Sequence, residues 1–205
     1  EVVIRGASLR WTDELRGTPP LELAAVDLLV RNTLRGHRWR LDATPPPDWG
    51  ERFSLRGEFT QSLLARSGDW RHWSGQIHVD APRADASPLR RYLDLPFEWS
   101  QGVGAVRAWF EFRAGEPLAF TLDLALRAVA LRLGAELEPL VVEQLQGRLS
   151  WQRGEQGGRL SLQRLEFVTG DGVRWPRGDL EVAWTRGADG TSGGGELSAG
   201  RLDLA

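Results

Sequence analysis

The chain has 205 residues, of which 41% are hydrophobic and 26% are charged, a balance that is ordinary for a folded domain. Its formal net charge is −2, so no overall positive field attracts nucleic acid or an anionic membrane surface. The absence of cysteine excludes a disulfide framework and thiolate metal sites, and the absence of a run of about 18 apolar residues excludes a membrane-spanning helix.

Most of the chain alternates apolar and polar residues with a period of two, which predicts β-strands. The first strand is expected in "EVVIRGASLRW", and the chain ends in a similar segment, "GELSAGRLDLA". Because both ends look cut from a longer polypeptide, we expect residues 1–205 to be one β-rich segment from the interior of a much longer protein. Five strands are predicted directly from the alternation, at 2–11, 21–31, 37–43, 103–113 and 160–168.

Other strands are predicted from a short pattern in which glycine is followed by any residue and then an apolar one. Each glycine is expected at a strand entry, where it can adopt a positive φ. Hairpin turns are predicted at Asp171–Gly172 and at 188–190, and a mobile loop is predicted at 185–195. The pattern begins at Gly57, Gly75, Gly147, Gly158, Gly178 and Gly195.

One short helix has a clear start in "DASPLRRYLDL". Ser87 is expected to cap it, and Pro88 suits the first helical position. Pro96 ends it soon afterwards, so a helix is predicted near 88–94. The expected fold class is therefore all-β, a long antiparallel sheet with one short helix.

The longest apolar stripe lies in "LAFTLDLALRAVALRL" at 118–133. The alternation slips once at Ala128, which predicts a β-bulge and a local bend. The stripe either packs inside a sealed core or lines an open groove, and periodicity alone does not separate these alternatives. Its apolar positions are Leu118, Phe120, Leu122, Leu124, Leu126, Val129, Leu131 and Leu133.

The sequence contains no recognisable catalytic, nucleotide-binding or metal-binding motif. His72 and His78 are too far apart along a strand to share a metal ion, at about 20 Å. Asp80 and Asp85 could form an acid–base pair, but turn chemistry also accounts for them. We therefore expect no enzymatic activity and no cofactor.

Four segments in the middle of the chain resemble the YhdP branch of the AsmA-like family of Gram-negative envelope proteins. They are "WSGQIHVDAPRADASPLRRYLDLP" at 73–96, "GVGAVRAWFEF" at 102–112, "LDLALRAVALRL" at 122–133 and "LEPLVVEQLQGRLSW" at 137–151. The resemblance implies a strongly curved sheet shaped like a taco, with an apolar groove inside. It also implies a periplasmic location, as part of a protein anchored in the inner membrane.

The resemblance implies a non-enzymatic segment that conducts phospholipid acyl chains between the inner and outer membranes. Its partners would be those acyl chains, neighbouring segments of the same long chain, and the envelope membranes through parts outside 1–205, but no nucleic acid. The alternatives are a scaffolding β-domain with a closed core and protein partners, and a carbohydrate-active β-enzyme or lectin-like module suggested by the ten tryptophans. Besides the stripe residues named above, the expected groove lining is Val106, Phe110, Phe112, Leu149 and Trp151.

Overall fold

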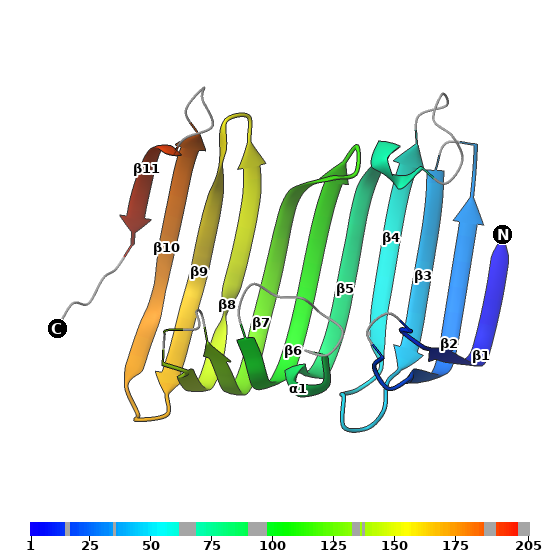
Figure 1. Ribbon diagram of the computed structural model, residues 1–205, viewed down its shortest axis with the longest axis horizontal. Helices are drawn as coiled ribbons and strands as arrows, with labels where there is room; N and C mark the ends of the chain where they lie inside the picture. The colour runs from blue at the N-terminus through cyan, green and yellow to red at the C-terminus, as the bar shows by residue number, and fades with distance from the viewer. Residues whose placement is uncertain are drawn as a thin grey trace.

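Segments that alternate apolar and polar side chains form strands along most of the chain, and these strands pair in sequence order. The computed structural model describes residues 1–14, 17–34, 36–61, 69–89, 98–132, 136, 138–186 and 192–200. Within them, eleven strands make one antiparallel sheet in the order β1 to β11, which is not closed into a barrel (Figure 1). The strands are β1 (Val2–Trp11), β2 (Leu21–Asn32), β3 (Gly36–Thr44), β4 (Phe53–Gln61), β5 (Trp73–Asp85), β6 (Glu98–Arg113), β7 (Glu116–Arg132), β8 (Leu140–Gly154), β9 (Gly157–Thr169), β10 (Arg174–Arg186) and β11 (Ser192–Ala199).

The structure confirms the five strands predicted directly from alternation, and it shows that hairpins join many neighbours. Gly172 has a φ of +86° in the turn between β9 and β10, as expected for the predicted turn at Asp171–Gly172. The turn between β6 and β7 was not predicted. There, Ala114 and Gly115 have φ values of +50° and +74°, the double positive φ of a two-residue hairpin turn.

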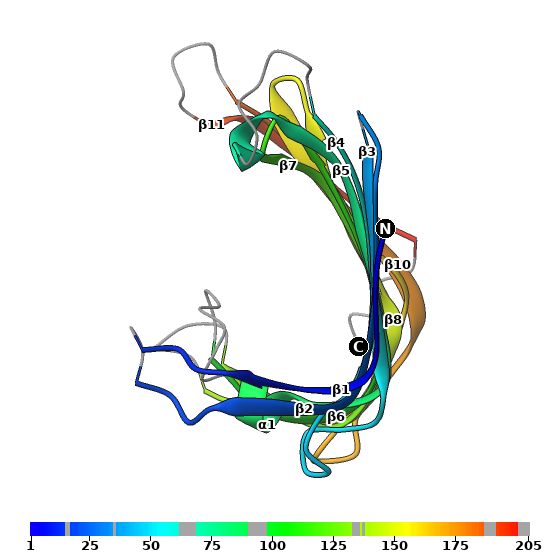
Figure 2. The ribbon, with the colours of Figure 1, turned by 90° about the vertical axis from the view of Figure 1, so that its right-hand side faces the viewer.

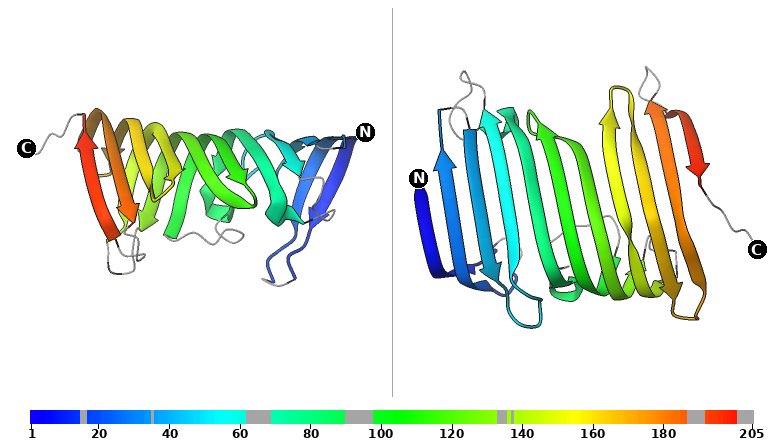
Figure 3. Two further views of the ribbon diagram at one scale, coloured as in Figure 1. Left: turned by 90° about the horizontal axis from the view of Figure 1, so that it is seen from above. Right: turned by 180° about the vertical axis from the view of Figure 1, so that it is seen from behind.

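The sheet is strongly curved along its strands, as the expected fold class requires. Figure 2 shows β1 and β2 turning sharply partway along their length, so that the sheet has a C-shaped profile. Figure 3 shows from above and from behind that the strands nevertheless remain in one layer. Positive φ values mark places where an extra residue interrupts the pairing, at Gly6, Ala25, Ala128 and Arg164, and Gly102 also has a positive φ on β6 opposite the Ala128 bulge. The bulge predicted at Ala128 is therefore confirmed, and bulges of this kind bend a strand.

Aspartate side chains bond to backbone groups that the bulges release from the ladder. The amide of Gly6 donates to Oδ1 of Asp27 at 2.9 Å, and the amide of Arg164 donates to Oδ1 of Asp179 at 2.7 Å. The guanidinium of Arg52 donates to the carbonyl of Ala25 and to Asp27, both at 2.6 Å. The sheet can therefore bend without leaving these polar groups unsatisfied.

The buried core consists of two small clusters beside the bulges. One contains Leu23, Val26 and Ala43 on β2 and β3. The other contains Leu126, Val129 and Val142 on β7 and β8, with partly buried neighbours such as Phe167 packed against it. Bending brings side chains on the inner face of the sheet closer together, and this explains why burial is deepest there.

The predicted helix is present, but its start and its cap differ from the prediction. The helix α1 spans Ala86–Leu89, and residues 90–94 of the prediction lie outside the described residues. Asp85 is the cap, because its Oδ1 accepts a hydrogen bond from the amide of Ser87 at 2.8 Å. A short 3-10 helix, η1 (Trp70–His72), precedes β5.

The expectation of a mobile loop at 185–195 is wrong at both of its ends. Residues 185 and 186 belong to β10, and 192–195 belong to β11, where Arg186 pairs with Ser192 and Trp184 pairs with Gly195. The turn predicted at 188–190 lies outside the described residues.

The expectation of a positive φ at the six patterned glycines is wrong, and only Gly75 and Gly158 lie near the start of a strand. Gly57, Gly147, Gly178 and Gly195 lie inside strands, and none of the six has a positive φ. The glycine at position 57 is explained by the lack of room for a side chain. A Cβ added there would lie 2.2 Å from Nε1 of Trp39 and 2.9 Å from Cζ of Phe59. The Trp39 ring thus lies directly against the backbone of the neighbouring strand.

We predict that Gly57→Ala destabilises the sheet by about 1–3 kcal/mol, because the Trp39 ring must leave its position over residue 57. Gly195→Ala is the control, since a Cβ added there would meet only the carbonyl oxygen of Ala183, at an ordinary contact distance of 3.6 Å. Urea unfolding of both variants measures the difference. Equal midpoints for the two variants would show that Trp39 does not require a glycine beside it.

Candidate functional site

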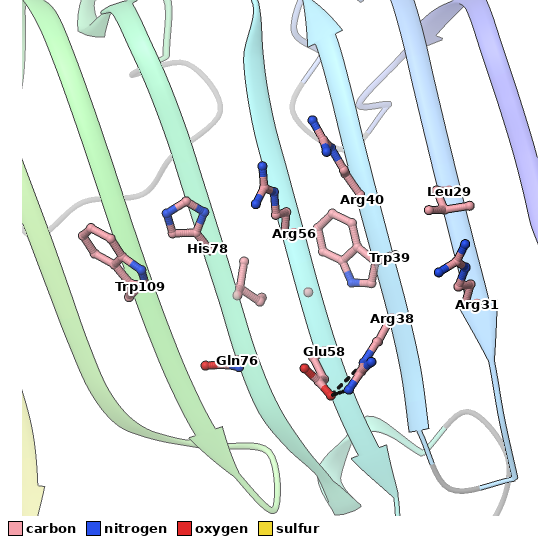
Figure 4. Close-up of a pocket in the computed structure, with 12 residues that line it drawn as sticks. Leu29, Arg31, Arg38, Trp39, Arg40, Arg56, Glu58, Gln76, His78 and Trp109 are labelled. Atoms are coloured by element: carbon pink, nitrogen blue, oxygen red, sulfur yellow. Dashed lines mark hydrogen bonds and ion pairs between the residues drawn. The ribbon is translucent and has the colours of Figure 1, made fainter.

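The two faces of the curved sheet carry different side chains, polar on the outer, convex face and apolar on the inner, concave face. Figure 4 looks onto the convex face, the side opposite to Figure 1, and labels Arg40, Arg56 and His78 there. Side chains alternate between faces along a strand, so residues such as Leu41, Leu55 and Ile77 point to the concave face. The concave face is thus apolar, and the convex face is mainly polar.

On the concave face, cross-strand partners form two continuous rows that run perpendicular to the strands. Each row takes one residue from every strand, and every position is apolar or glycine. We call them the apolar rows. The first is Val2, Val30, Trp39, Gly57, Ile77, Phe110, Phe120, Trp151, Leu160, Val182 and Leu197. The second is Ile4, Leu28, Leu41, Leu55, Val79, Ala108, Leu122, Leu149, Leu162, Leu180 and Ala199.

Most side chains in the apolar rows are half-buried, and those on the edge strands are more exposed. Val2 on β1 is 53% exposed and Leu197 on β11 is 64% exposed, whereas Phe110 on the central strand β6 is 41% exposed. In the part of the chain that the structure describes, no second sheet or layer of helices covers this face. Eleven strands spaced about 4.8 Å apart make the rows about 48 Å long. The described structure therefore presents a long, continuous apolar surface on the hollow side of the sheet.

Aromatic rings reinforce this surface across strand boundaries. The ring of Phe120 lies 6.4 Å from Phe110 on one side and 5.8 Å from Trp151 on the other. Phe59 similarly contacts Phe112 at 5.4 Å. Such spacings suit offset or tilted ring pairs, which stabilise neighbouring strands beyond the area they bury.

The structure brings most of the predicted lining residues together at the centre of the concave face. Phe120, Leu122, Trp151, Leu149 and Phe110 belong to the apolar rows. Leu124 pairs with Val106, Leu131 pairs with Leu140, and Phe112 pairs with Pro117. Leu118 has no direct cross-strand partner on β6 because the register shifts there, and Leu133 lies outside the described residues.

Two of the predicted lining residues are buried in the core, so they add little to the accessible surface of the concave face. Leu126 is 4% exposed and Val129 is 1% exposed, and both belong to the buried cluster beside the Ala128 bulge. A ligand resting on the concave face would therefore meet Phe120 and Leu122 before these two.

Sequence reasoning missed the parts of the apolar rows that lie outside β6, β7 and β8. Trp39 and Ile77 on one side, and Leu160 and Val182 on the other, extend the surface to both edges. Period-two alternation was visible in each of these strands. Their alignment into rows depends on the cross-strand register, which no single strand reveals.

The convex face carries ion pairs, some between neighbouring strands and some along a single strand. Arg148 donates to both carboxylate oxygens of Asp123, at 2.6 and 2.7 Å, and this hydrogen bonding lowers the pKa of Asp123 below its usual range. Arg40 likewise donates to both oxygens of Asp42 and lowers the pKa of that carboxyl, which also accepts a hydrogen bond from Ser54.

The residues considered for catalysis or metal binding have structural partners instead. Asp80 pairs with Arg107 at 3.5 Å, and Asp85 caps α1. His72 lies in η1 beside Asp69, whereas His78 lies on β5. Among the described residues, no group of three His, Asp or Glu side chains could hold a metal ion. No helix in the described ranges has the length and apolar character needed to span a membrane.

Comparison with known proteins agrees with the resemblance noted in the sequence. The family model described as YhdP protein matches residues 1–205. No curated protein and no solved structure matches the chain.

We predict that Asp123→Asn lowers the free energy of unfolding by about 1 kcal/mol at pH 7, because it breaks a charge-assisted pair that is part-buried. Because the pKa of Asp123 is lowered in the folded protein, its pair with Arg148 stabilises the fold fully at pH values above 3.8, the ordinary pKa of an aspartate. That contribution is lost as the pH falls through the folded-state pKa, so the variant and the wild type should converge in acid.

The control is Glu116→Gln, which removes a more exposed pair with Arg153. It should change the free energy of unfolding by less than about 0.5 kcal/mol. Urea unfolding at several pH values measures both variants. If Asp123→Asn behaves like the control at every pH, the Asp123–Arg148 pair does not stabilise the sheet.

Proposed function

Because the chain belongs to the YhdP family, which is related to lipid transport and is not a known enzyme family, we propose that this segment conducts phospholipid acyl chains along its concave face. The observation that supports the proposal is the continuity of the apolar rows, which cross all eleven strands without a polar residue. The conducting path runs across the strands, from β1 to β11 or the reverse.

The chemistry of the apolar rows suits a moving acyl chain. Each CH₂ group that leaves water for such a surface gains about 0.8 kcal/mol. Leu, Val, Ile and aromatic side chains make no directional bonds with hydrocarbon, so a chain can exchange one position for the next at little cost. The hollow side is open in profile (Figure 2), so a charged headgroup can remain in water and avoid the cost of burial.

We extend the proposal to partners and location, as the family resemblance implies. The edge strands β1 and β11 each pair on one side, and neighbouring segments of the same long chain would pair with their free sides. The whole protein would be anchored in the inner membrane, with this segment in the periplasm, and would reach the envelope membranes through parts outside 1–205.

We predict that Leu122→Asp and Leu124→Asp keep the fold with a modest loss of thermal stability but lose most bound phospholipid. Both side chains are half-buried on the concave face, so a carboxylate there can reach water while it interrupts the acyl path. Thermal melting combined with lipid quantification by mass spectrometry measures both properties on the same preparation.

Thr121→Asp is the matched control, because it places the same charge one residue away on the convex face, opposite Trp109 and Ser150. It should leave bound lipid unchanged. If the stripe lay in a sealed core, each Leu variant would lose several kcal/mol of its free energy of unfolding, which is typically about 5–15 kcal/mol in total. Both variants would then largely unfold. Unfolding of both, together with wild-type protein that never carries lipid, would favour the scaffolding domain with a closed core.

A further inference from the structure

A pocket on the convex face is lined mainly by polar side chains, and three members of the first apolar row, Trp39, Gly57 and Ile77, also border it. It has a volume of about 530 Å³ and lies over β2 to β6 (Figure 4). Four of its side chains are direct cross-strand neighbours on β3, β4, β5 and β6, namely Arg40, Arg56, His78 and Trp109. We call these four residues the convex row.

The pocket contains more positive charge than the surrounding side chains neutralise. Arg38 is paired with Glu58 at 2.6 Å, and Arg40 is paired with Asp42 at 2.7 Å. Among the described residues, Arg56 forms no ion pair or hydrogen bond. Arg40 uses Nε and Nη2 for Asp42, so its Nη1 forms no hydrogen bond within the part of the chain that the structure describes.

Arg56 lies directly opposite Arg40, and because Asp42 already neutralises Arg40, the charge without a partner in this pair is that of Arg56. Like charges that face each other across two strands destabilise the pair. An oxyanion between the two guanidinium groups would convert this repulsion into two charge-assisted contacts. The charge pattern therefore points to an anionic group as the missing partner.

The other end of the convex row is aromatic. The rings of His78 and Trp109 lie 5.0 Å apart, and Trp109 is 36% exposed although it lies outside the apolar rows. An indole on a polar face offers a flat surface to a ring with C–H groups, and the remaining pocket side chains, such as Gln76 and Glu58, can hydrogen-bond to hydroxyl groups. These are the side-chain types that bind sugars.

We propose that the convex row is a binding site for an anionic saccharide, with a carboxylate or phosphate between Arg40 and Arg56 and a sugar ring against Trp109. Arg56 and Trp109 lie two strands apart, or about 10 Å, which is the length of about two sugar rings. The site lies on the face opposite the acyl path, so it does not depend on the proposed lipid function.

Other ligand classes fit the site less well. The backbone of β3 to β6 is paired on both sides within the sheet, so an extended peptide finds no free strand edge to join. The net charge of −2 opposes nucleic acid. An acyl chain would meet guanidinium groups and not a continuous apolar surface.

The test is calorimetric titration of the 205-residue chain with digalacturonate and with its dimethyl ester, which keeps the rings and removes the charge. Digalacturonate should bind, and the ester should bind about tenfold more weakly or worse. Arg56→Gln should also weaken digalacturonate binding about tenfold. Trp109→Thr, which keeps a good strand former at that position, should weaken it about three- to tenfold.

Arg159→Gln is the control, because it removes one positive charge from β9 outside the pocket, where Arg159 pairs with Glu181. It should leave digalacturonate binding unchanged, and circular dichroism should show the same fold for every variant. Absence of binding at millimolar digalacturonate would overturn the proposal. Equal affinity for inorganic phosphate or for tetra-aspartate, with the same dependence on Arg56, would also overturn it, because the site would then recognise charge without a sugar.

Discussion

The structure depends on keeping a two-residue side-chain period in register across eleven neighbouring strands. A slip of one residue in any strand would turn its apolar side chains to the convex face and its charged ones to the concave face. The apolar rows would then be interrupted at that strand. Cross-strand contacts on both faces oppose such a slip. Arg148 meets Asp123 on the convex face, while Phe120 meets Trp151 on the concave face, and both pairs join β7 to β8.

The bulges satisfy a second requirement, since the sheet must bend without losing this register. At Ala128 one extra residue is inserted, so Leu126 and Val129 lie three positions apart and still point to the same side. The inserted residue adopts a positive φ, which is unfavourable for alanine. Burial of Leu126, Val129 and Val142 at the bend offsets this cost, because these side chains pack together only if the strands curve. The curvature of the sheet and the packing of this core cluster therefore depend on each other.

The sequence predicted the local features well, because alternation is a local signal. It located the five strands predicted from alternation and the bulge at Ala128, where the slip is visible in the residues themselves, and it placed the short helix with a start about two residues too late. It did not predict the bulges at Ala25 and Arg164. Neither residue favours a positive φ by itself. Each bulge is held by a distant group, namely Arg52 for the carbonyl of Ala25 and Asp179 for the amide of Arg164. Gly57 was misinterpreted for a similar reason, because its partner is a ring on another strand.

The candidate site shows the same division between local and non-local information. The part of the predicted stripe from Phe120 to Leu131 lies on one face of β7, but a stripe along one strand has only the length of that strand. The apolar rows run perpendicular to it, and their length is set by the number of strands. For an acyl path this difference matters. A longer strand widens the apolar surface on which the acyl chain lies, whereas an additional strand makes the path about 4.8 Å longer. A protein that conducts lipid in this way would therefore lengthen its route by repeating hairpins in register, and each added pair needs only alternation and a turn to continue the apolar rows.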